Sequence, residues 1–116
     1  MTAADYTPKR YPVTVTRGDA WSEAFTFSQS GAALNMSTWT WVAQIRRERD
    51  HGSELVATMT VGTASASTGT ISVSVTSAQT TVDPGIYWWA LKRTDAGNQR
   101  TFILDEFRID PQVVDA

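Results

Sequence analysis

Few residues in this chain have the types and spacing that catalysis requires. His51 is the single histidine, and it follows Asp50 in the charged segment 46–52, where we expect a solvated loop. The chain has no cysteine, so a nucleophile would have to be a serine or threonine, and the sequence identifies no base to activate it. We therefore predict no catalytic residues and a protein that is not an enzyme.

Metal and cofactor binding have equally little support in the sequence. Asp105, Glu106 and Asp110 are close together, but the alternation of a strand would point them to different faces, and a solvated sheet edge is the simplest expectation. No glycine-rich loop follows a strand and opens a helix, as phosphate binding would require. We predict neither a metal site nor a cofactor.

Charge and hydropathy also limit the classes of partner. The net charge is −2, and acidic residues interleave with the basic residues of segment 46–52, so we expect no nucleic-acid partner. No run approaches the roughly 20 apolar residues of a membrane span, and no secretion signal is recognisable, so we expect no membrane partner. Arg17-Gly18-Asp19 matches the tripeptide that integrins recognise, but a turn between strands explains both Gly18 and Asp19.

Tryptophan is the most distinctive residue type in the sequence. Four of the five tryptophans share strand parity with other apolar residues, and these are predicted to lie in the core: Trp21, Trp39, Trp41 and Trp89. Trp88 differs, because it shares parity with Ile86 on the opposite side of the same strand. An exposed ring beside an apolar neighbour is typical of a protein contact. The alternative is a carbohydrate-binding module, which would need a second exposed ring coplanar with Trp88.

Strand signals cover nearly the whole sequence. Apolar residues alternate with polar ones in seven segments separated by turn residues, and no segment has a helical period, so we predict an antiparallel β-sandwich. The expected strands span residues 11–16, 20–27, 39–46, 55–61, 70–76, 86–91 and 101–109. The 116 residues form one predicted domain, with a flexible N-terminal arm at 1–10, the sandwich at 11–110 and a C-terminal tail at 111–116.

Several local features leave alternatives open. Pro12 suits an edge strand, because proline cannot donate a ladder hydrogen bond. Glu23 falls on the apolar face of its strand, so it lies either at the rim of the core or beside a bulge. Segment 62–69 is predicted to be a flexible connection, and one helical turn is compatible with residues 78–82. The register of the last strand is uncertain around Asp105 and Glu106.

Three segments together resemble a known family. The patterns at 13–27, 39–46 and 84–91 resemble, in the same order, the small immunoglobulin-like domains of tailed bacteriophages, which are similar to the N-terminal domain of baseplate upper proteins. The resemblance covers roughly residues 11 to 109, although Asp105 and Glu106 stand near a point where the family tends to have a small residue such as glycine. It implies a seven-stranded immunoglobulin-like sandwich.

The resemblance also implies a context for this chain. That context is a non-enzymatic structural protein of the virion, assembled in the cytoplasm of the host bacterium. A tail or baseplate accessory protein is favoured, and a capsid-decoration or head–tail protein of the same fold is the alternative. The expected partners are other virion proteins in symmetric copies, with a host glycan as a weaker alternative. We expect the docking residues to lie on the outer face and in the arm: Ile86, Trp88, Tyr6, Pro8 and Arg10.

Overall fold

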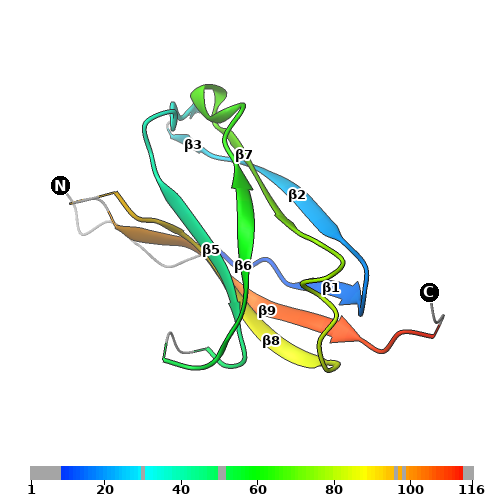
Figure 1. Ribbon diagram of the computed structural model, residues 1–116. Coiled ribbons are helices and arrows are strands. Elements are labelled where there is room, and N and C mark those ends of the chain that lie inside the picture. Colours follow the sequence, from blue (N-terminus) through cyan, green and yellow to red (C-terminus); the bar gives the residue numbers. More distant parts are fainter. Residues whose placement is uncertain (1–8, 30, 50–51, 96, 98, 114–116) are drawn as a thin grey trace.

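Alternating apolar residues form strands along most of the chain. The computed structural model describes residues 9–29, 31–49, 52–95, 97 and 99–113 (Figure 1). Its elements are β1 (Val13–Thr16), β2 (Trp21–Thr26), β3 (Ser28–Gln29), β4 (Ala32–Ala33), β5 (Trp41–Arg46), β6 (Leu55–Gly62), the 3₁₀-helix η1 (Ala66–Thr68), β7 (Thr70–Val75), β8 (Gly85–Arg93) and β9 (Arg100–Asp110). The described part of the chain is therefore all-β, as the sequence predicts, and it contains no α-helix.

Seven of these strands form one mixed sheet. Its order is β1-β9-β8-β5-β6-β7-β2, and β3 pairs with β4 in a separate hairpin. Each neighbouring pair is antiparallel except β1 and β9, which run parallel. The expectation of a wholly antiparallel sheet is therefore wrong for this pair. A parallel pair needs a long crossover connection, and here the whole body of the chain between the first and last strands provides it.

The sheet curves until its two edge strands lie near each other. β6 makes this possible, because it pairs with β5 over Leu55 to Met59 and with β7 over Thr60 to Gly62. Tyr11, just before β1, bridges the gap: its hydroxyl donates to Glu23 Oε2 over 2.9 Å. The β2–β7 register is unbroken, so Glu23 lies at the rim of the core without a bulge. The first strand is an edge strand, as predicted, but it begins at Val13, so Pro12 lies just before it.

The core lies on the inner face of the curved sheet. Trp89 of β8 is its largest side chain, with 1% of its surface exposed, and its ring centroid is 5.7 Å from that of Trp21 and 6.0 Å from that of Phe25. Its indole N–H donates to the carbonyl of Tyr11 over 3.0 Å, so the one polar group of the ring is satisfied. The prediction that Trp89 belongs to the core is confirmed.

A second group of rings lies where β5 begins. β5 starts at Trp41, so Trp39 precedes it, and both side chains are half-buried where full burial is expected from the sequence. The β8–β9 register shifts beside Leu91, and Phe102 is left out of the ladder. Its ring centroid lies 5.4 Å from that of Trp41 and 5.2 Å from that of Phe27. Because Phe102 lies at this bulge, strand parity alone does not predict its contacts with the other rings.

One connecting segment differs from its sequence prediction, and in a second the structure decides between the alternatives. Segment 62–69 is expected from the sequence to be a flexible connection, but it contains η1. Ala66 of η1 is buried, and its carbonyl accepts a hydrogen bond from the backbone N–H of Met36 over 2.8 Å. These contacts hold the segment against the core. Gly69 has φ of +86°, and an added Cβ would lie 2.8 Å from the carbonyl oxygen of Phe27. Residues 78–82 form turns without a helix, and the buried hydroxyl of Thr80 donates to the carbonyl of Asp19 over 2.8 Å.

The last strand places its acidic pair on opposite faces. The β8–β9 register is unbroken from Ile103 to Ile109. This defines the register around Asp105 and Glu106, which the sequence leaves open. Asp105 faces inward with 2% of its surface exposed, so the expectation of a solvated edge is wrong for this residue. Arg10 Nη2 lies 2.9 Å from Asp105 Oδ1, and the backbone N–H of Glu106 donates to the same oxygen. These hydrogen bonds offset the free-energy cost of burying the charged carboxylate.

The expected N-terminal arm ends on the same strand. Lys9 N donates to the carbonyl of Phe102 over 2.8 Å, and Leu104 N donates to the carbonyl of Lys9 over 3.1 Å. With the ion pair of Arg10, these bonds place the last two residues of segment 1–10 on β9. Tyr6 and Pro8 lie outside the described residues.

A candidate docking face on the outer side of the sheet

The outer face of β5, β8 and β9 carries the residues that the sequence assigns to a protein contact. Strand alternation turns Tyr87 and Trp89 inward, so Ile86 and Trp88 must point outward. Ile86 is 54% exposed, and Val42 of β5, which lies opposite Lys92 near the other end of β8, is 38% exposed. Trp88 is half-buried on this outer face. The strand register thus places the two predicted docking residues on one surface.

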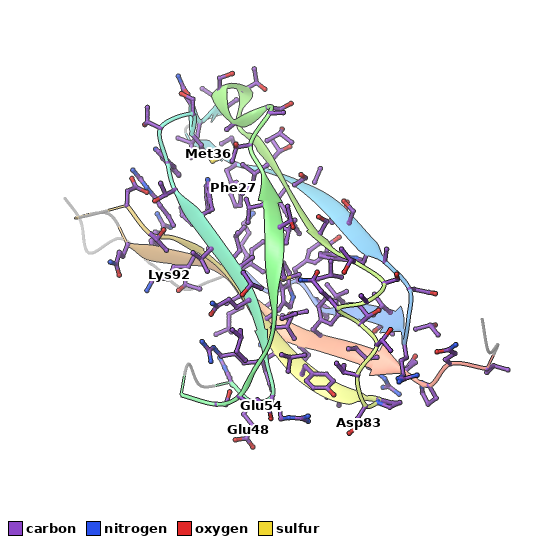
Figure 2. The ribbon with its side chains drawn as sticks, in the orientation of Figure 1. Phe27, Met36, Glu48, Glu54, Asp83 and Lys92 are labelled. Atoms are coloured by element: carbon purple, nitrogen blue, oxygen red, sulfur yellow. The ribbon has the colours of Figure 1, made fainter. Side chains whose placement is uncertain are left out.

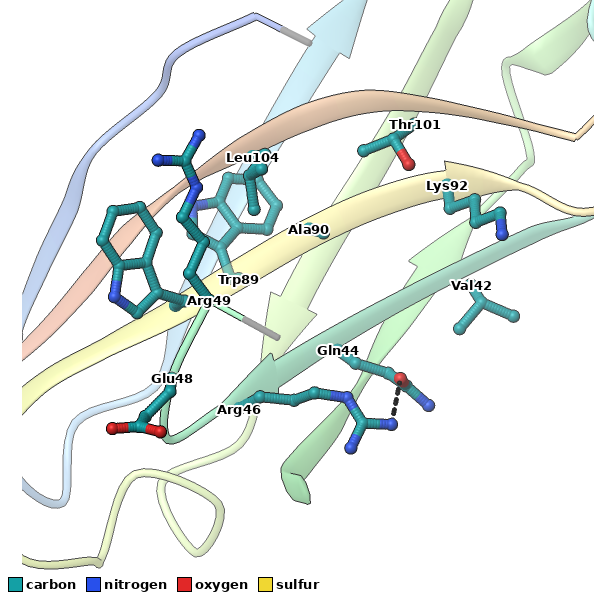
Figure 3. A pocket seen from close by; sticks show the side chains of 11 residues that line it. Val42, Gln44, Arg46, Glu48, Arg49, Trp89, Ala90, Lys92, Thr101 and Leu104 are labelled. Atoms are coloured by element: carbon teal, nitrogen blue, oxygen red, sulfur yellow. Dashed lines mark hydrogen bonds between the residues drawn. The ribbon is translucent and has the colours of Figure 1, made fainter. Parts of the chain in front are cut away.

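A shallow pocket of about 400 Å³ opens on this face (Figure 3). Residues of β5, β8 and β9, together with the loop after β5, line it: Val42, Gln44, Arg46, Glu48, Arg49, Trp88, Trp89, Ala90, Lys92, Thr101 and Leu104. Trp88 is the partly exposed aromatic ring among these lining residues, because Trp89 is buried behind the sheet surface. The pocket therefore combines an apolar floor with polar and charged sides.

Cations border this apolar floor. The Arg49 guanidinium carbon lies 5.2 Å from the ring centroid of Trp88, in cation–π contact. Arg46 is fixed in place, since Nη1 donates to the carbonyl of Ser53 over 2.7 Å and Nη2 donates to Gln44 Oε1 over 3.1 Å (Figure 3). With Lys92, the lining has three cations against the single carboxylate of Glu48. Such a face suits a partner that supplies apolar groups and carboxylates.

The geometry of this pocket suits binding better than chemistry. Its lining contains no histidine or serine, and its one threonine, Thr101, has no general base beside it among these residues. A neutral sugar would need a second exposed ring coplanar with Trp88, and the pocket does not supply one. An apolar centre rimmed by polar and charged side chains is the usual composition of a protein contact.

The structure places the other sequence candidates elsewhere. Arg10 is paired with Asp105, so its guanidinium is already engaged within the chain. His51 and Asp50 lie outside the described residues. Arg17 and Gly18 belong to a turn, where Gly18 has φ of 88° and Arg17 Nε donates to the carbonyl of Val82 over 2.9 Å. This supports the structural interpretation of the Arg-Gly-Asp tripeptide.

The described residues lack two further features. They contain no group of three or more histidine, cysteine, aspartate or glutamate side chains placed to hold a metal ion. They also contain no helix that is long and apolar enough to cross a membrane.

Sequence reasoning did not find the arginines that stack on exposed rings. Arg49 lies over Trp88, and Arg93 lies over Trp39 with its guanidinium carbon 3.7 Å from the ring centroid. These pairs join residues far apart in sequence, so no local pattern predicts them. The ion pair of Arg10 with Asp105 was missed too, although the alternation of β9 offered a signal, because Asp105 shares parity with Ile103 and Phe107.

Comparison with known proteins does not place the chain in a family. No family model matches it, and no curated protein matches it. A solved structure that it resembles is AggA, the major subunit of aggregative adherence fimbriae type I from Escherichia coli. The two chains are 13% identical, the match covers 91% of each, and the TM-score is 0.28. A likeness of this size carries no argument about fold or function.

Proposed function

We propose that this chain is a non-catalytic structural protein of a tailed-bacteriophage virion, which docks onto neighbouring virion proteins through the outer face of β5, β8 and β9. The observation that carries the docking role is the placement of Ile86 and Trp88. The two side chains lie two residues apart on the outward side of β8, and Trp88 lines an apolar pocket bordered by cations. Such a surface is costly to leave in water and is typical of an interface.

The strand order supports an immunoglobulin type of sandwich. In that fold the third, sixth and seventh strands, C, F and G, share one sheet, while B, E and D share the other. When the seven sheet strands are lettered in chain order, β5, β8 and β9 are C, F and G, and they are neighbours. Likewise β2, β7 and β6 are B, E and D, and they are neighbours too.

A tyrosine at the start of β8 adds independent support for this fold type. The Tyr87 hydroxyl donates to the backbone carbonyl of Asp83, four residues upstream. Immunoglobulin domains have such a tyrosine near the start of strand F, two residues before a cysteine. Trp89 holds the position of that cysteine in this cysteine-free chain. The bulky buried indole thus replaces the disulfide as the link between the layers.

The virion context rests on the resemblance of three sequence segments to bacteriophage domains. Segments 13–27, 39–46 and 84–91 contain β1, β2, β5 and most of β8, which together form both edges and the centre of the sheet. A tail or baseplate accessory position is our first proposal, and capsid decoration is the alternative with the same fold. In both positions the partners are other virion proteins in symmetric copies.

A particle-incorporation experiment tests this function. Trp88→Ala and the control Leu55→Ala would be produced in a host that assembles the particles, and the copies per purified particle would be counted by quantitative mass spectrometry. Leu55 is 43% exposed on β6 and does not line the pocket, although it lies opposite Arg46, so it controls for loss of an exposed apolar side chain at the border of the docking face. We expect loss of incorporation for Trp88→Ala and none for Leu55→Ala. Absence of the unaltered chain from particles would refute the virion role.

A further inference from the structure

The outer face of β5, β8 and β9 carries an ordered arrangement of charge around Trp88. The strand register aligns Arg46 of β5, Trp88 of β8 and Glu106 of β9 in one row across the sheet. Neighbouring strands lie about 4.8 Å apart, so both charged residues are close to the ring, and both are half-buried. Opposite charges therefore flank Trp88, with the cation on the β5 side and the carboxylate on the β9 side.

The next row repeats this pattern with the signs exchanged. Ile86 of β8 lies opposite Arg108 of β9, and on the β5 side Glu48 borders the same recess as Ile86. Glu48 and Arg108 are both exposed. Arg47 and Glu54, which also line that recess, compensate each other in an ion pair of 2.7 Å. In this row the carboxylate is thus on the β5 side and the cation is on the β9 side.

Neither charge of the central row is compensated by a direct ion pair within the described part of the chain. The guanidinium of Arg46 donates there to neutral acceptors, a backbone carbonyl and an amide oxygen. Glu106 is close enough to Arg10 to raise the pKa of that guanidinium, but Arg10 forms its direct ion pair with Asp105. Arg46 and Glu106 therefore still gain from a partner that supplies the opposite charge.

A twofold axis over this face, parallel to β8, matches the pattern of charge to itself. Rotation about such an axis places the β5 side of one copy over the β9 side of the other, while β8 faces β8. Arg46 then faces Glu106 of the second copy, Glu48 faces Arg108, and Trp88 faces its own counterpart. Symmetry makes each of these charge pairs occur twice. A second copy of the chain thus supplies the complementary pattern that this face requires.

The geometry of packed sheets is compatible with these contacts. Two sheets pack face to face about 10 Å apart, with their strands inclined by about 30°. Such an inclination displaces residues little when they lie within one strand of the axis, as Arg46 and Glu106 do. Their long side chains can meet in the gap between the sheets. Arg108 contributes less, because it also pairs with Asp110 of its own strand over 2.8 Å.

The like charge on the axis lies where it opposes the contact least. Lys92 of β8 is four residues from Trp88 and at the other end of the face from Glu48 (Figure 2). Its long aliphatic stem allows the ammonium group to remain in water at the border of the contact. The lysines of two copies therefore need not be buried against each other.

We propose that the chain forms a twofold-symmetric dimer through the outer face of β5, β8 and β9. The inference rests on the proposed docking role of this face and identifies the neighbour as a second copy of the chain. Trp88 and Ile86 supply the apolar centre, and the charge pairs fix the relative orientation of the copies. The outer face is the convex side of a curved sheet, so few strands meet, and we expect a weak dimer that dissociates on dilution.

Exchange of charge tests the dimer by analytical ultracentrifugation of the full chain. Arg46→Glu and Glu106→Arg each place like charges opposite each other, so each variant alone should be monomeric at about 100 μM, where the unaltered chain dimerises. An equimolar mixture of the two variants should dimerise again. One variant carries glutamate at both positions of the pair and the other carries arginine at both, so every contact between them joins opposite charges.

Lys9→Glu is the matched control for the charge change. Lys9 is exposed and lines a different recess, with Phe27 and Trp39, so this variant should dimerise as the unaltered chain does. Circular dichroism checks that each variant folds. The dimer is refuted if the unaltered chain is monomeric up to about 500 μM, if Arg46→Glu dimerises as the unaltered chain does, or if the mixture of folded variants stays monomeric.

A cross-linking measurement keeps the test decisive if Arg46→Glu does not fold. The chain contains no cysteine, so Ala90→Cys introduces a single thiol on the outward side of β8, near the proposed axis. A short bismaleimide should link two copies of this variant. Ala24→Cys, the same change at an exposed position of β2, is the control and should not be linked. Equal linking of the two variants would refute the dimer.

These experiments separate the dimer from the virion role, because they use the purified chain alone. A dimer in solution, together with absence of the chain from particles, would refute the virion role and leave the dimer in place. A monomeric chain that still requires Trp88 for incorporation would refute the dimer and leave the docking role in place.

Discussion

The two sides of β8 use the same residue type for different purposes. Trp89 is 1% exposed and packs against Trp21, Phe25 and Tyr11, and its indole N–H is hydrogen-bonded. Trp88, its neighbour, is half-buried on the outer face beside Arg49. The comparison shows that position in the pleat, and not residue type, decides whether a tryptophan stabilises the fold or is available to a partner.

β9 repeats this contrast with carboxylates. Asp105 pairs with Trp89 across the ladder on the inner side, and Glu106 pairs with Trp88 on the outer side. The inward carboxylate requires Arg10 and a backbone N–H, whereas the outward one is half-exposed to water. One acidic pair in the sequence therefore becomes one structural residue and one surface residue.

The largest effect is expected from the inner tryptophan. Trp89→Ala should lower the free energy of unfolding by about 3 to 5 kcal/mol, because it leaves a large cavity at the centre of the core. For a small domain this is a large share of the total stability, so the variant should be insoluble or unfolded. Urea unfolding followed by circular dichroism measures the change. If Trp88→Ala unfolds the domain and Trp89→Ala does not, the strand register described here is wrong.

The next effect concerns the inner carboxylate. Asp105→Asn should cost about 2 kcal/mol, because it removes a charge-assisted hydrogen bond from a buried position. Glu106→Gln is the matched control on the outer side, and it should change stability by less than about 0.5 kcal/mol. Urea titrations of the two variants compare the faces directly. Equal costs would contradict the assignment of one carboxylate to each face.

Because Asp105 is ion-paired in the folded state, the free energy of unfolding should depend on pH. The hydrogen bond from Arg10 lowers the pKa of Asp105 from its usual value of 3.8, against the opposing effect of burial. A depressed pKa in the folded state means that the stabilisation is fully present above pH 3.8 and is lost as the pH falls towards the folded-state pKa. The unaltered chain should therefore lose more stability than Asp105→Asn in that acidic range. Parallel acid-unfolding curves would argue against the ion pair.

A small effect on stability is expected from the outer tryptophan. Trp88→Ala should melt within a few degrees of the parent, because truncation on the sheet surface leaves no internal cavity. Differential scanning calorimetry measures the shift. Loss of particle incorporation without loss of stability would separate docking from folding, while a drop in melting temperature as large as that of Trp89→Ala would remove the distinction between the two faces.

The smallest effect is expected at the histidine of the charged loop. His51→Ala should change the free energy of unfolding by no more than about 0.5 kcal/mol, since we expect a solvated side chain there. No hydrolytic activity of the purified chain should depend on it. Parallel assays of parent and variant against ester, phosphate and glycoside substrates check this, and a reproducible activity lost in His51→Ala would overturn the non-catalytic classification.

The sequence predicts local features of this fold better than its long-range contacts. Alternation alone identifies β5, β7 and β8 and the inward direction of Trp89, because a half-buried strand repeats every two residues. It does not predict the parallel pairing of β1 with β9, since that depends on which strands meet after the chain has folded. The bulge at Phe102 is hidden for the same reason, and so are the contacts of its ring with Trp39 and Trp41.

In the candidate site, too, local features are predicted from the sequence and long-range contacts are not. Ile86 and Trp88 are found from parity, which is a local property of one strand. Arg49 and Arg93 are not found, because their stacking partners Trp88 and Trp39 lie elsewhere in the sequence. A buried carboxylate such as Asp105 is detectable in principle by its parity, but its partner Arg10 is distant in the chain.

Electron cryomicroscopy of the assembled particle tests the central claim most directly. The measurement is the solvent exposure of Ile86 and Trp88 in density assigned to this chain. We expect both side chains to be buried against a neighbouring virion protein, with the pocket between β5 and β9 filled by that neighbour. Density in which the outer face of β8 points into solvent, while the chain is held to the particle by another surface, would contradict it.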